Sequence, residues 1–507
     1  MDITKLQQFF GGITKGERDR RVGVAFNVED CDIFENQDYI EPTTIFVADD
    51  ITRRTQAYEV SEADNGYAYS QSADGDAEIM VLATASADNP TTWSSAFEST
   101  GDVHPNGTLA WFKWNTGADY LYYPTISGTT VSLKKLGDLT TYTETTAALN
   151  GTDATTLDGL DATGDRMQFI KGFTEMYILN GKYISKISSA GVFTQHAFTL
   201  DDNLTAVSAA LKGEFLYILC KYANAGLNSS RIAVWDLSHT TQAVDYIDVP
   251  CGGPQWIANH GDILRVLCVR SGTAQFFEVQ QGLHAVKTHE LASMKTETAA
   301  QPISPVNTVF IDNNILYFGL WKTDKTGLYA LGRVTEGAPL ALVLAKRFDT
   351  SDYSTHTPNA ASKFGNNWFA AMLDNATENT MRIEGNNSPT RSSNAVYESV
   401  WFDGGNPEAI KDWRGYIVLS KVIPTSCEIK VDCKVDNATN YDTNSLVTLT
   451  STNDYNHGGG TAGTYWHRIT TSLAGRFLRI RIRFTSSTTT KPTLYQVSIL
   501  SDARKTI

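Results

Sequence analysis

The stretch GEFLYIL at residues 213–219 joins a turn marked by glycine to a run of aromatic and aliphatic residues. A short apolar run bounded by turn residues is typical of a buried β-strand. Six other segments share this layout, with Gly, Asn or Asp at or near most of their turns: DAEIMVL at 76–82, DYLYY at 119–123, TEMYIL at 174–179, GDILRVL at 261–267, NNILYF at 313–318 and NNWFA at 366–370. The recurrence predicts a series of similar β units along most of the chain.

The spacing of these segments indicates what each unit is. Their centres are about 40 to 55 residues apart, and a β-propeller blade of four short antiparallel strands needs roughly 40 to 50 residues. Further strands follow the phrase where a blade requires them, as at 231–235 and 243–249. We therefore expect an all-β fold with a β-propeller of about seven blades over residues 61–395. Six or eight blades are alternatives, and a β-sandwich or β-solenoid would explain only part of the pattern.

The C-terminal part of the chain has a different pattern. Residues 427–435 and 478–484 alternate apolar with charged side chains, which is the period of a strand with one buried face, and 494–500 reads as a third strand. We expect an antiparallel β-sandwich of jelly-roll type over residues 396–507. Residues 1–60 then form an N-terminal assembly segment that packs on the propeller or on a neighbouring protein.

The composition excludes several classes of function. The 507 residues are 41% hydrophobic and 19% charged, with a formal net charge of −14, so the chain can build a core and is not disordered throughout. An acidic protein lacks the general basic surface that binds phosphates, and we expect no specific nucleic acid partner. The first residues lack the layout of a signal peptide and no apolar run is long enough to span a bilayer, so we expect a soluble protein without stable membrane insertion.

Motifs of catalysis and cofactor binding are missing. The sequence has no P-loop, G-x-G-x-x-G, G-x-S-x-G or H-E-x-x-H motif, and only His284 and His289 are neighbouring histidines. The six cysteines form no C-x-x-C pair, which predicts buried reduced thiols: Cys31, Cys220, Cys251, Cys268, Cys427 and Cys433. We expect no catalytic, cofactor-binding or metal-binding residues, no cofactor, and no enzyme. A carboxylate pair for glycoside hydrolysis stays open, because such partners meet in space and not in sequence.

Two short motifs allow more specific interpretations. SADNPTTW at residues 86–93 approaches the S-x-D-x-G-x-T-W hairpin of sialidase-like propellers, with Pro90 in place of glycine. Even a full match would be a structural hairpin and not a catalytic element. VWDL at 234–237 resembles the end of a WD-repeat blade, but it occurs once and is better interpreted as a strand with a buried tryptophan.

Two groups of charged residues have both a functional and a structural interpretation. Asp158, Asp161 and Asp165 would suit calcium, although aspartates between strands are mostly solvated turn residues. The second group is a row of arginines on one face of the 478–484 strand, preceded by Arg476. This row would suit a phosphate or an acidic partner, but we favour a solvated charged face.

A resemblance adds a second line of inference. FFGGI at residues 9–13, followed by RDRRVGVAFNVEDCDIF at 18–34, resembles the start of many tailed-bacteriophage virion proteins, in which such phrases precede a long β-propeller. YESVWFDGG at 397–405 looks like the start of the sandwich that often follows. The resemblance implies a structural component of the tail or neck, of the nozzle, hub or tail-tip type.

The hypotheses differ in the partners they imply. The leading one is a virion structural protein that is made in the host cytoplasm, forms a symmetric homo-oligomeric ring, and docks other tail or neck proteins or fibres for host attachment. The alternative is a carbohydrate-binding or glycan-degrading β-propeller that acts on host surface polysaccharide, motivated by the abundant Trp and Tyr residues and the hairpin at 86–93. A third is a propeller scaffold for soluble protein partners.

Overall fold

A computed structural model of the chain gives the arrangement of its strands. It describes these residues: 2–6, 25–34, 39–43, 47–48, 54–60, 66–82, 93–127, 130–137, 143–146, 166–223, 229–280, 284–297, 302–323, 325–333, 340–347, 356–364, 367–374, 378–384, 394–403, 407–436, 438–442, 446–451, 465–487 and 490–503. Contacts divide the chain into two compact units. The propeller unit consists of residues 47–326 and 350–386, and the sandwich unit of residues 1–46, 327–349 and 387–507.

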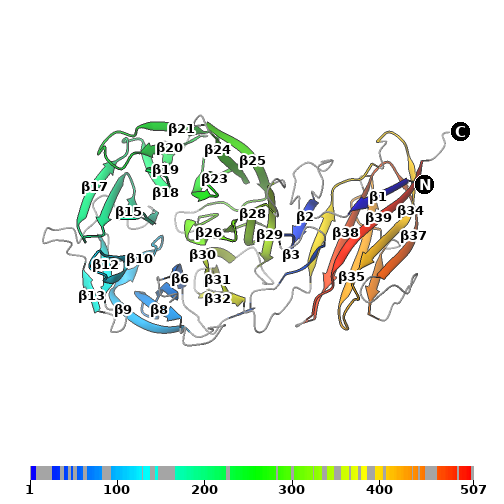
Figure 1. Ribbon diagram of the computed structural model, residues 1–507, viewed down its shortest axis with the longest axis horizontal. Helices are drawn as coiled ribbons and strands as arrows, with labels where there is room; N and C mark the ends of the chain where they lie inside the picture. Colours follow the sequence, from blue (N-terminus) through cyan, green and yellow to red (C-terminus); the bar gives the residue numbers. More distant parts are fainter. Residues whose placement is uncertain are drawn as a thin grey trace. The chain divides into compact units, whose positions relative to one another are not determined.

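The propeller unit is built from small antiparallel sheets in which strands neighbouring in sequence also pair. Three sheets are regular: β14–β17 (Met167–Lys171, Glu175–Asn180, Tyr183–Ser188, Phe193–Thr199), β18–β21 (Leu204–Lys212, Phe215–Tyr222, Ser230–Trp235, Asp245–Val249) and β22–β25 (Pro254–His260, Ile263–Arg270, Thr273–Gln280, His284–Ala292). This order is that of propeller blades, and Figure 1 shows the sheets of this unit following one another around a common centre. The predicted fold class is confirmed.

The other strands of the unit lie before and after these three sheets. One sheet contains β6 (Arg54–Val60), β7 (Gly66–Gln71), β8 (Asp76–Leu82), β9 (Trp93–Val103), β10 (Ala110–Lys113), β11 (Asp119–Ser127), β12 (Thr130–Gly137) and β13 (Thr143–Thr146), with β9 paired to β11. β26 (Phe310–Asp312) pairs with β27 (Ile315–Leu320) after the short 3₁₀ turn η1 (Val306–Thr308). The last sheet has the order β30 (His356–Phe364), β31 (Asn367–Asp374), β32 (Glu378–Glu384) and β5 (Val47–Ala48).

The Gly, Asn and Asp residues of the recurring segment form hairpin turns, and a strand begins directly after each turn. Gly261–Asp262 and Asn313–Asn314 are two-residue hairpin loops in which both residues have positive φ, between 47° and 60°. Type I′ turns require this conformation, which Gly, Asn and Asp tolerate best. The phrase is the second strand of its sheet in β15, β19, β23 and β31, but the segment at 76–82 is β8, the third strand after β6 and β7. The apolar run of β8 resembles a second strand because both inner strands of a blade are buried.

The propeller unit closes by contact between its first and last sheets. Trp93 packs against Phe364 and Phe369, with ring centroids 6.0 and 5.5 Å apart, and Tyr58 joins the same buried cluster. β5 adds a fourth strand to β32, although it precedes β6 in the sequence. Each blade has two apolar faces, and a closed ring buries both of them.

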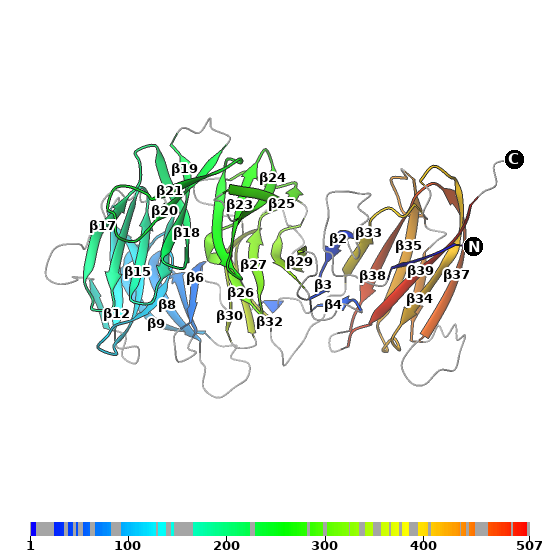
Figure 2. The same cartoon turned by 45° about the horizontal axis from the view of Figure 1, so that its top comes forward.

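The sandwich unit has two layers, which Figure 2 shows as separate groups of strands. One sheet has the order β1 (Asp2–Leu6), β39 (Leu494–Ala503), β34 (Lys411–Ser420) and β37 (Tyr465–Gly475). The other contains β28 (Gly327–Gly332), β29 (Ala341–Arg347), β2 (Ala25–Glu29), β33 (Ala395–Ser399), β38 (Leu478–Thr485), β35 (Glu428–Val435) and β36 (Val447–Thr450). A short pair, β3 (Cys31–Asp32) and β4 (Glu41–Pro42), completes the described strands. Ile480, Ile482 and Phe484 are buried, so the alternation in β38 has the predicted sides.

The boundaries of the units differ from those expected at residues 60 and 395. Residues 1–46 belong with the C-terminal part of the chain, because β1 pairs with β39 and β2 pairs with β33. Residues 327–349 are grouped there as well, since β2 also lies parallel to β29. A periodic pattern identifies strands but not their partners, and these pairings join residues hundreds of positions apart.

Candidate functional site

The candidate site is a polar hollow in the propeller unit, near the starts of the first strands of several sheets. The hollow is shallow: the cavity itself has a volume of about 20 Å³, and the space reaches about 320 Å³ only when the open solvent at its mouth is included. It is lined by Gln56, Pro105, Asn106, Arg166, Met167, Pro302, Pro305, Val306, Asn307 and Asn359. These residues come from β6, β14, β30 and the segments before β10 and β26. Four side-chain amides and one guanidinium make the lining rich in hydrogen-bonding groups.

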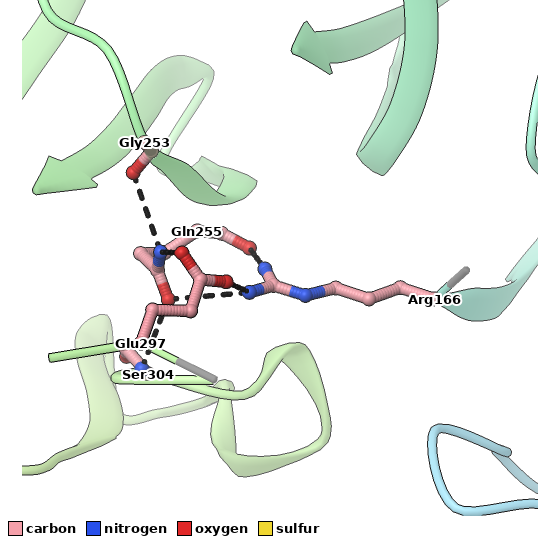
Figure 3. A network of polar contacts seen from close by, with 5 residues as sticks. All are labelled: Arg166, Gly253, Gln255, Glu297 and Ser304. Carbon is pink, nitrogen blue, oxygen red and sulfur yellow. Dashed lines mark hydrogen bonds and ion pairs between the residues drawn. The ribbon is translucent and has the colours of Figure 1, made fainter. Parts of the chain in front are cut away.

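Arg166 is the one cation of this lining, and its side chain is only 12% exposed. From the residue before β14 it reaches Gln255 at β22, where its Nη1 donates to the main-chain oxygen at 2.8 Å and its Nη2 contacts Oε1 at 3.4 Å. Nη2 also pairs with Glu297, whose side chain is 39% exposed. Figure 3 shows this guanidinium held between Gln255 and Glu297. Burial lowers the pKa of Arg166, and the Glu297 carboxylate opposes that effect.

Gln255 anchors the far side of this network. It is fully buried, and its Nε2 donates to Glu297 Oε2 at 3.1 Å and to the Gly253 carbonyl at 3.3 Å. Its Oε1 accepts the main-chain N–H of Ser304 at 3.1 Å (Figure 3). Each polar atom of the amide therefore has a partner, which fixes the orientation of both the amide and the arginine.

Polar side chains also join neighbouring sheets near their first strands, from the turn η1, from β30 and from β14. Asn307 Nδ2 donates to the carbonyls of Gln56 and Gly107, both at 2.8 Å, and Asn359 Nδ2 donates to the carbonyl of Thr55 at 2.5 Å. Farther along, the main-chain N–H of Ala209 donates to Gln168 Oε1 at 2.8 Å. Inner strands of different sheets share no backbone ladder in these places, so side-chain amides supply the hydrogen bonds instead.

A buried histidine supports the rim of the hollow. The N–H of Asn106 donates to His104 Nδ1 at 3.1 Å, and the N–H of His104 donates to the Tyr69 hydroxyl at 2.8 Å. The Tyr69 hydroxyl in turn donates to the carbonyl of Pro124 at 2.5 Å. Burial lowers the pKa of His104 to about 4. The imidazole is therefore neutral at pH 7 and can accept the hydrogen bond that positions Asn106.

The arginine row of the sandwich unit is not the solvated charged face that we expected. Arg479 is buried, and Arg481 and Arg483 both pair with Asp432 on β35. Rings of Trp401 and Tyr441 lie against the row, with Arg479 4.5 Å from the Trp401 centroid. The sequence pattern could not show this because the carboxylate and the two rings lie on other segments.

The other sequence candidates have simple structural roles or lie outside the described residues. Trp235 is buried, as predicted, and Trp93 packs in the contact that closes the ring. The cysteines are all buried and free, which confirms the prediction of reduced buried thiols. The rest of the hairpin at 86–93, the three aspartates at 158–165 and the FFGGI segment at 9–13 lie outside the described residues.

Neither a metal centre nor a membrane-spanning helix is found among the described residues. No group of three or more His, Cys, Asp or Glu side chains within them is arranged to hold a metal ion. No helix in the same part of the chain has the length and apolar character needed to cross a membrane.

Comparisons with known proteins give a fold likeness only. No model of a protein family matches the chain, and no curated protein does. Among solved structures, an exo-β-1,3-galactanase from Phanerochaete chrysosporium with galactose has 7% identity and a TM-score of 0.30, over 98% of this chain and 100% of that chain. A variant of that galactanase with β-1,3-galactotriose has 9% identity and a TM-score of 0.33, over 92% and 100%.

The expectation that the protein is not an enzyme does not stand, because it depended only on missing sequence motifs. The three solved structures compared with the chain are those of a galactanase, which is an enzyme. Motif searches miss sites whose residues are separated in sequence. A likeness of this strength carries neither the substrate nor the catalytic residues of that enzyme to this chain.

Sequence reasoning did not find the hollow or its arginine. Arg166 meets Gln255 across 89 positions and Glu297 across 131. One signal was present: several first strands of the repeated units carry an Asn, Gln or Ser among mostly apolar or small residues, as Gln168 and Gln255 show. A polar residue repeated at the innermost strand predicts a polar centre of the propeller.

Proposed function

We propose that the protein is a carbohydrate-active β-propeller that receives a saccharide unit of a host surface polysaccharide in the polar hollow. The observation that supports this most is the hollow itself, where amide side chains and Arg166 converge from separate strands. Sugars present neighbouring hydroxyl groups that both donate and accept hydrogen bonds. Planar amide, guanidinium and carboxylate groups match such pairs, and fixed orientations reduce the entropy lost on binding.

The network around Arg166 gives this proposal its sharpest test. Glu297 does not line the hollow itself but pairs with Arg166 of the lining, and it is the carboxylate on which hydrolysis would depend. A glycan array should show retention of specific oligosaccharides by the whole protein, and a reducing-sugar assay should measure release from the polysaccharide that binds best. Glu297→Gln should reduce sugar release by at least about a hundredfold while keeping the fold.

A matched control separates a site effect from a general one. Glu175 pairs with Lys186 at 2.7 Å in the same unit, away from the hollow lining, so Glu175→Gln should leave binding and release unchanged. The proposal is overturned if the wild-type protein retains no glycan and releases no sugar.

A second candidate is a structural component of a tailed-phage virion, in the tail or neck, where a ring of copies docks other tail proteins or fibres. One observation favours it: β1 pairs with β39 over five residue pairs, and Lys491 forms an ion pair with Glu41. Segments far apart in the sequence are thus locked into one sandwich, which suits a protein that bears load. Mass spectrometry of purified particles should detect the protein, and its absence from them would remove this candidate.

A further inference from the structure

Two buried thiols in the propeller unit are hydrogen-bonded to each other. Cys251 precedes β22 and Cys268 lies on β23, and both side chains belong to one buried apolar cluster. Ser230 on β20 contacts both residues, because its hydroxyl donates to the Cys251 carbonyl at 2.6 Å and is hydrogen-bonded to the Cys268 thiol. The two sulfur atoms are thus neighbours, which is the first requirement for a disulfide.

The main chain holds the two cysteines side by side. Pro254 and Cys268 are partners in the β22–β23 ladder, so Cys251 stands three residues before the partner of Cys268. The Val269 N–H donates to the Gly253 carbonyl at 2.8 Å, and a Cβ atom on Gly253 would collide with the Val269 carbonyl oxygen. Gly253 also has a φ of 66°, which glycine adopts without strain. This tight turn brings Cys251 back against β23.

The two thiols differ in acidity. The Cys268 thiol donates a hydrogen bond to Cys251, which lowers the pKa of Cys251 against the opposing effect of burial. The charges of Arg270 and Lys287 also lower it, and the charge of Glu290 raises it. Burial and the contact with Cys251 raise the pKa of Cys268. Cys251 is therefore the sulfur that more readily becomes a thiolate nucleophile, and Cys268 keeps its proton.

The surroundings of Cys251 favour a small oxidant. Arg270 and Lys287 are exposed, although both are near enough to affect the Cys251 thiol. Gly252 is partly exposed and Gly253 is exposed, so the turn beside Cys251 has no side chains that shield it. The thiol itself is buried, which admits a small uncharged molecule more easily than a bulky disulfide. A hydroperoxide is the oxidant of this size and charge.

We propose that Cys251 and Cys268 form a peroxide-sensitive dithiol that closes to a disulfide beside the β22–β23 hairpin. The Cys251 thiolate attacks one oxygen of hydrogen peroxide, the O–O bond breaks, and a sulfenic acid and hydroxide form. The hydroxide takes up the proton that Cys251 had lost and becomes water. The Cys268 sulfur then attacks the Cys251 sulfur, the S–O bond breaks, and the leaving hydroxide takes the Cys268 proton as a second water.

In sum, the two thiols lose two protons and two electrons, and one peroxide is reduced to two waters. The inference goes beyond the proposed function, because neither thiol lines the hollow and the reaction involves no saccharide.

The test uses the full chain and hydrogen peroxide as the oxidant. After treatment of the folded protein, the free thiols are alkylated in urea and the chain is digested with trypsin. The alkylated thiols should fall from six to four, and a disulfide should join the peptide that ends at Arg265 to the peptide that ends at Arg270. Dithiothreitol should reverse both changes. The oxidised protein should unfold at a urea concentration about 0.5 M higher, because the bond closes a loop in the unfolded chain.

Cysteine variants assign the role of each thiol. Cys268→Ser should leave Cys251 as a sulfenic acid that dimedone captures, whereas Cys251→Ser should give no disulfide and at least about tenfold less dimedone adduct. The matched control is Cys220→Ser. Cys220 is buried in the same unit and burial raises its pKa to about 12, so its loss should leave the disulfide between Cys251 and Cys268 unchanged.

The peptide map needs only the wild type, so it decides the proposal even where a variant does not fold. The proposal is overturned if peroxide leaves all six thiols free in the folded protein, or if other cysteines are joined as often as Cys251 and Cys268. It is also overturned if this disulfide forms only after urea has unfolded the chain.

Discussion

The two units of the molecule bind arginine side chains to carboxylates in different ways. Arg166 in the propeller unit is nearly buried and meets one carboxylate and two oxygens of Gln255, so its charge and its donors are largely matched. In the sandwich unit, Arg481 and Arg483 share Asp432, and their side chains are 26% and 34% exposed. A charge that is buried with its partners fixes the groups around it, whereas a partly exposed pair is screened by solvent and contributes less to stability.

Removal of Arg166 should have the largest effect on stability. Arg166→Met removes the donor to the main-chain oxygen of Gln255 and the cation that pairs with Glu297, although Gln255 Nε2 still donates to Glu297 and the Ser304 N–H still donates to Gln255 Oε1. We expect a cost of about 3 kcal/mol of the free energy of unfolding, at the low end for a broken buried pair because Glu297 is 39% exposed. Urea unfolding followed by tryptophan fluorescence measures the loss. Lys182→Met is the control, because its partner Asp202 is highly exposed and the pair should contribute nothing measurable. Equal stability of the two variants would refute the view that the Arg166 network is a matched buried pair.

The second largest effect should come from acid, which protonates His104 at the rim of the hollow and lowers the stability of the fold. The pKa of His104 is about 4 in the folded protein and about 6.5 in the unfolded chain, so between pH 6.5 and pH 4 the unfolded state binds a proton that the folded state does not. Stability therefore falls as the pH falls through this window, by up to about 3 kcal/mol from this one residue. His104→Gln should flatten the dependence measured by urea unfolding across that range. His284→Gln changes an exposed histidine and should leave the slope as it is; an unchanged slope in His104→Gln as well would contradict the prediction.

Loss of the Asp432 carboxylate should leave Arg481 and Arg483 without the acid that they share. Asp432→Asn removes the carboxylate that binds both Arg481 and Arg483, which should lower stability by about 2 kcal/mol. Thermal unfolding with and without about 50 mM sulfate should show that sulfate stabilises the variant more than the wild type. A variant that sulfate stabilises no more than the wild type would mean that Asp432 does not neutralise Arg481 and Arg483.

The sequence predicted the parts of this molecule that depend on local patterns. Alternation along 478–484 identified the buried and charged sides of β38, and the turn residues at Gly261 and Asn313 marked the hairpins of the propeller unit. The sequence could not predict contacts between segments that are far apart in the chain. Arg166 with Glu297 and the arginine row with Asp432 depend on ring closure and strand register, and neither leaves a periodic signal in the chain. The division into units failed to match expectation for the same reason, because β1 and β2 find their partners in the C-terminal part.

Replacement of Lys434 should have the smallest effect on the free energy of unfolding. Lys434→Gln loses the cation contact with the Tyr441 ring at 4.9 Å, which is worth about 0.5 kcal/mol at a half-exposed site. It also relieves the like-charge opposition to Arg479, which is of similar size. The free energy of unfolding, measured by urea unfolding, should therefore change by less than about 0.5 kcal/mol. A stability loss above about 1 kcal/mol would mean that Lys434 contributes to stability on the scale of a buried ion pair, and the contrast between the two units would not hold.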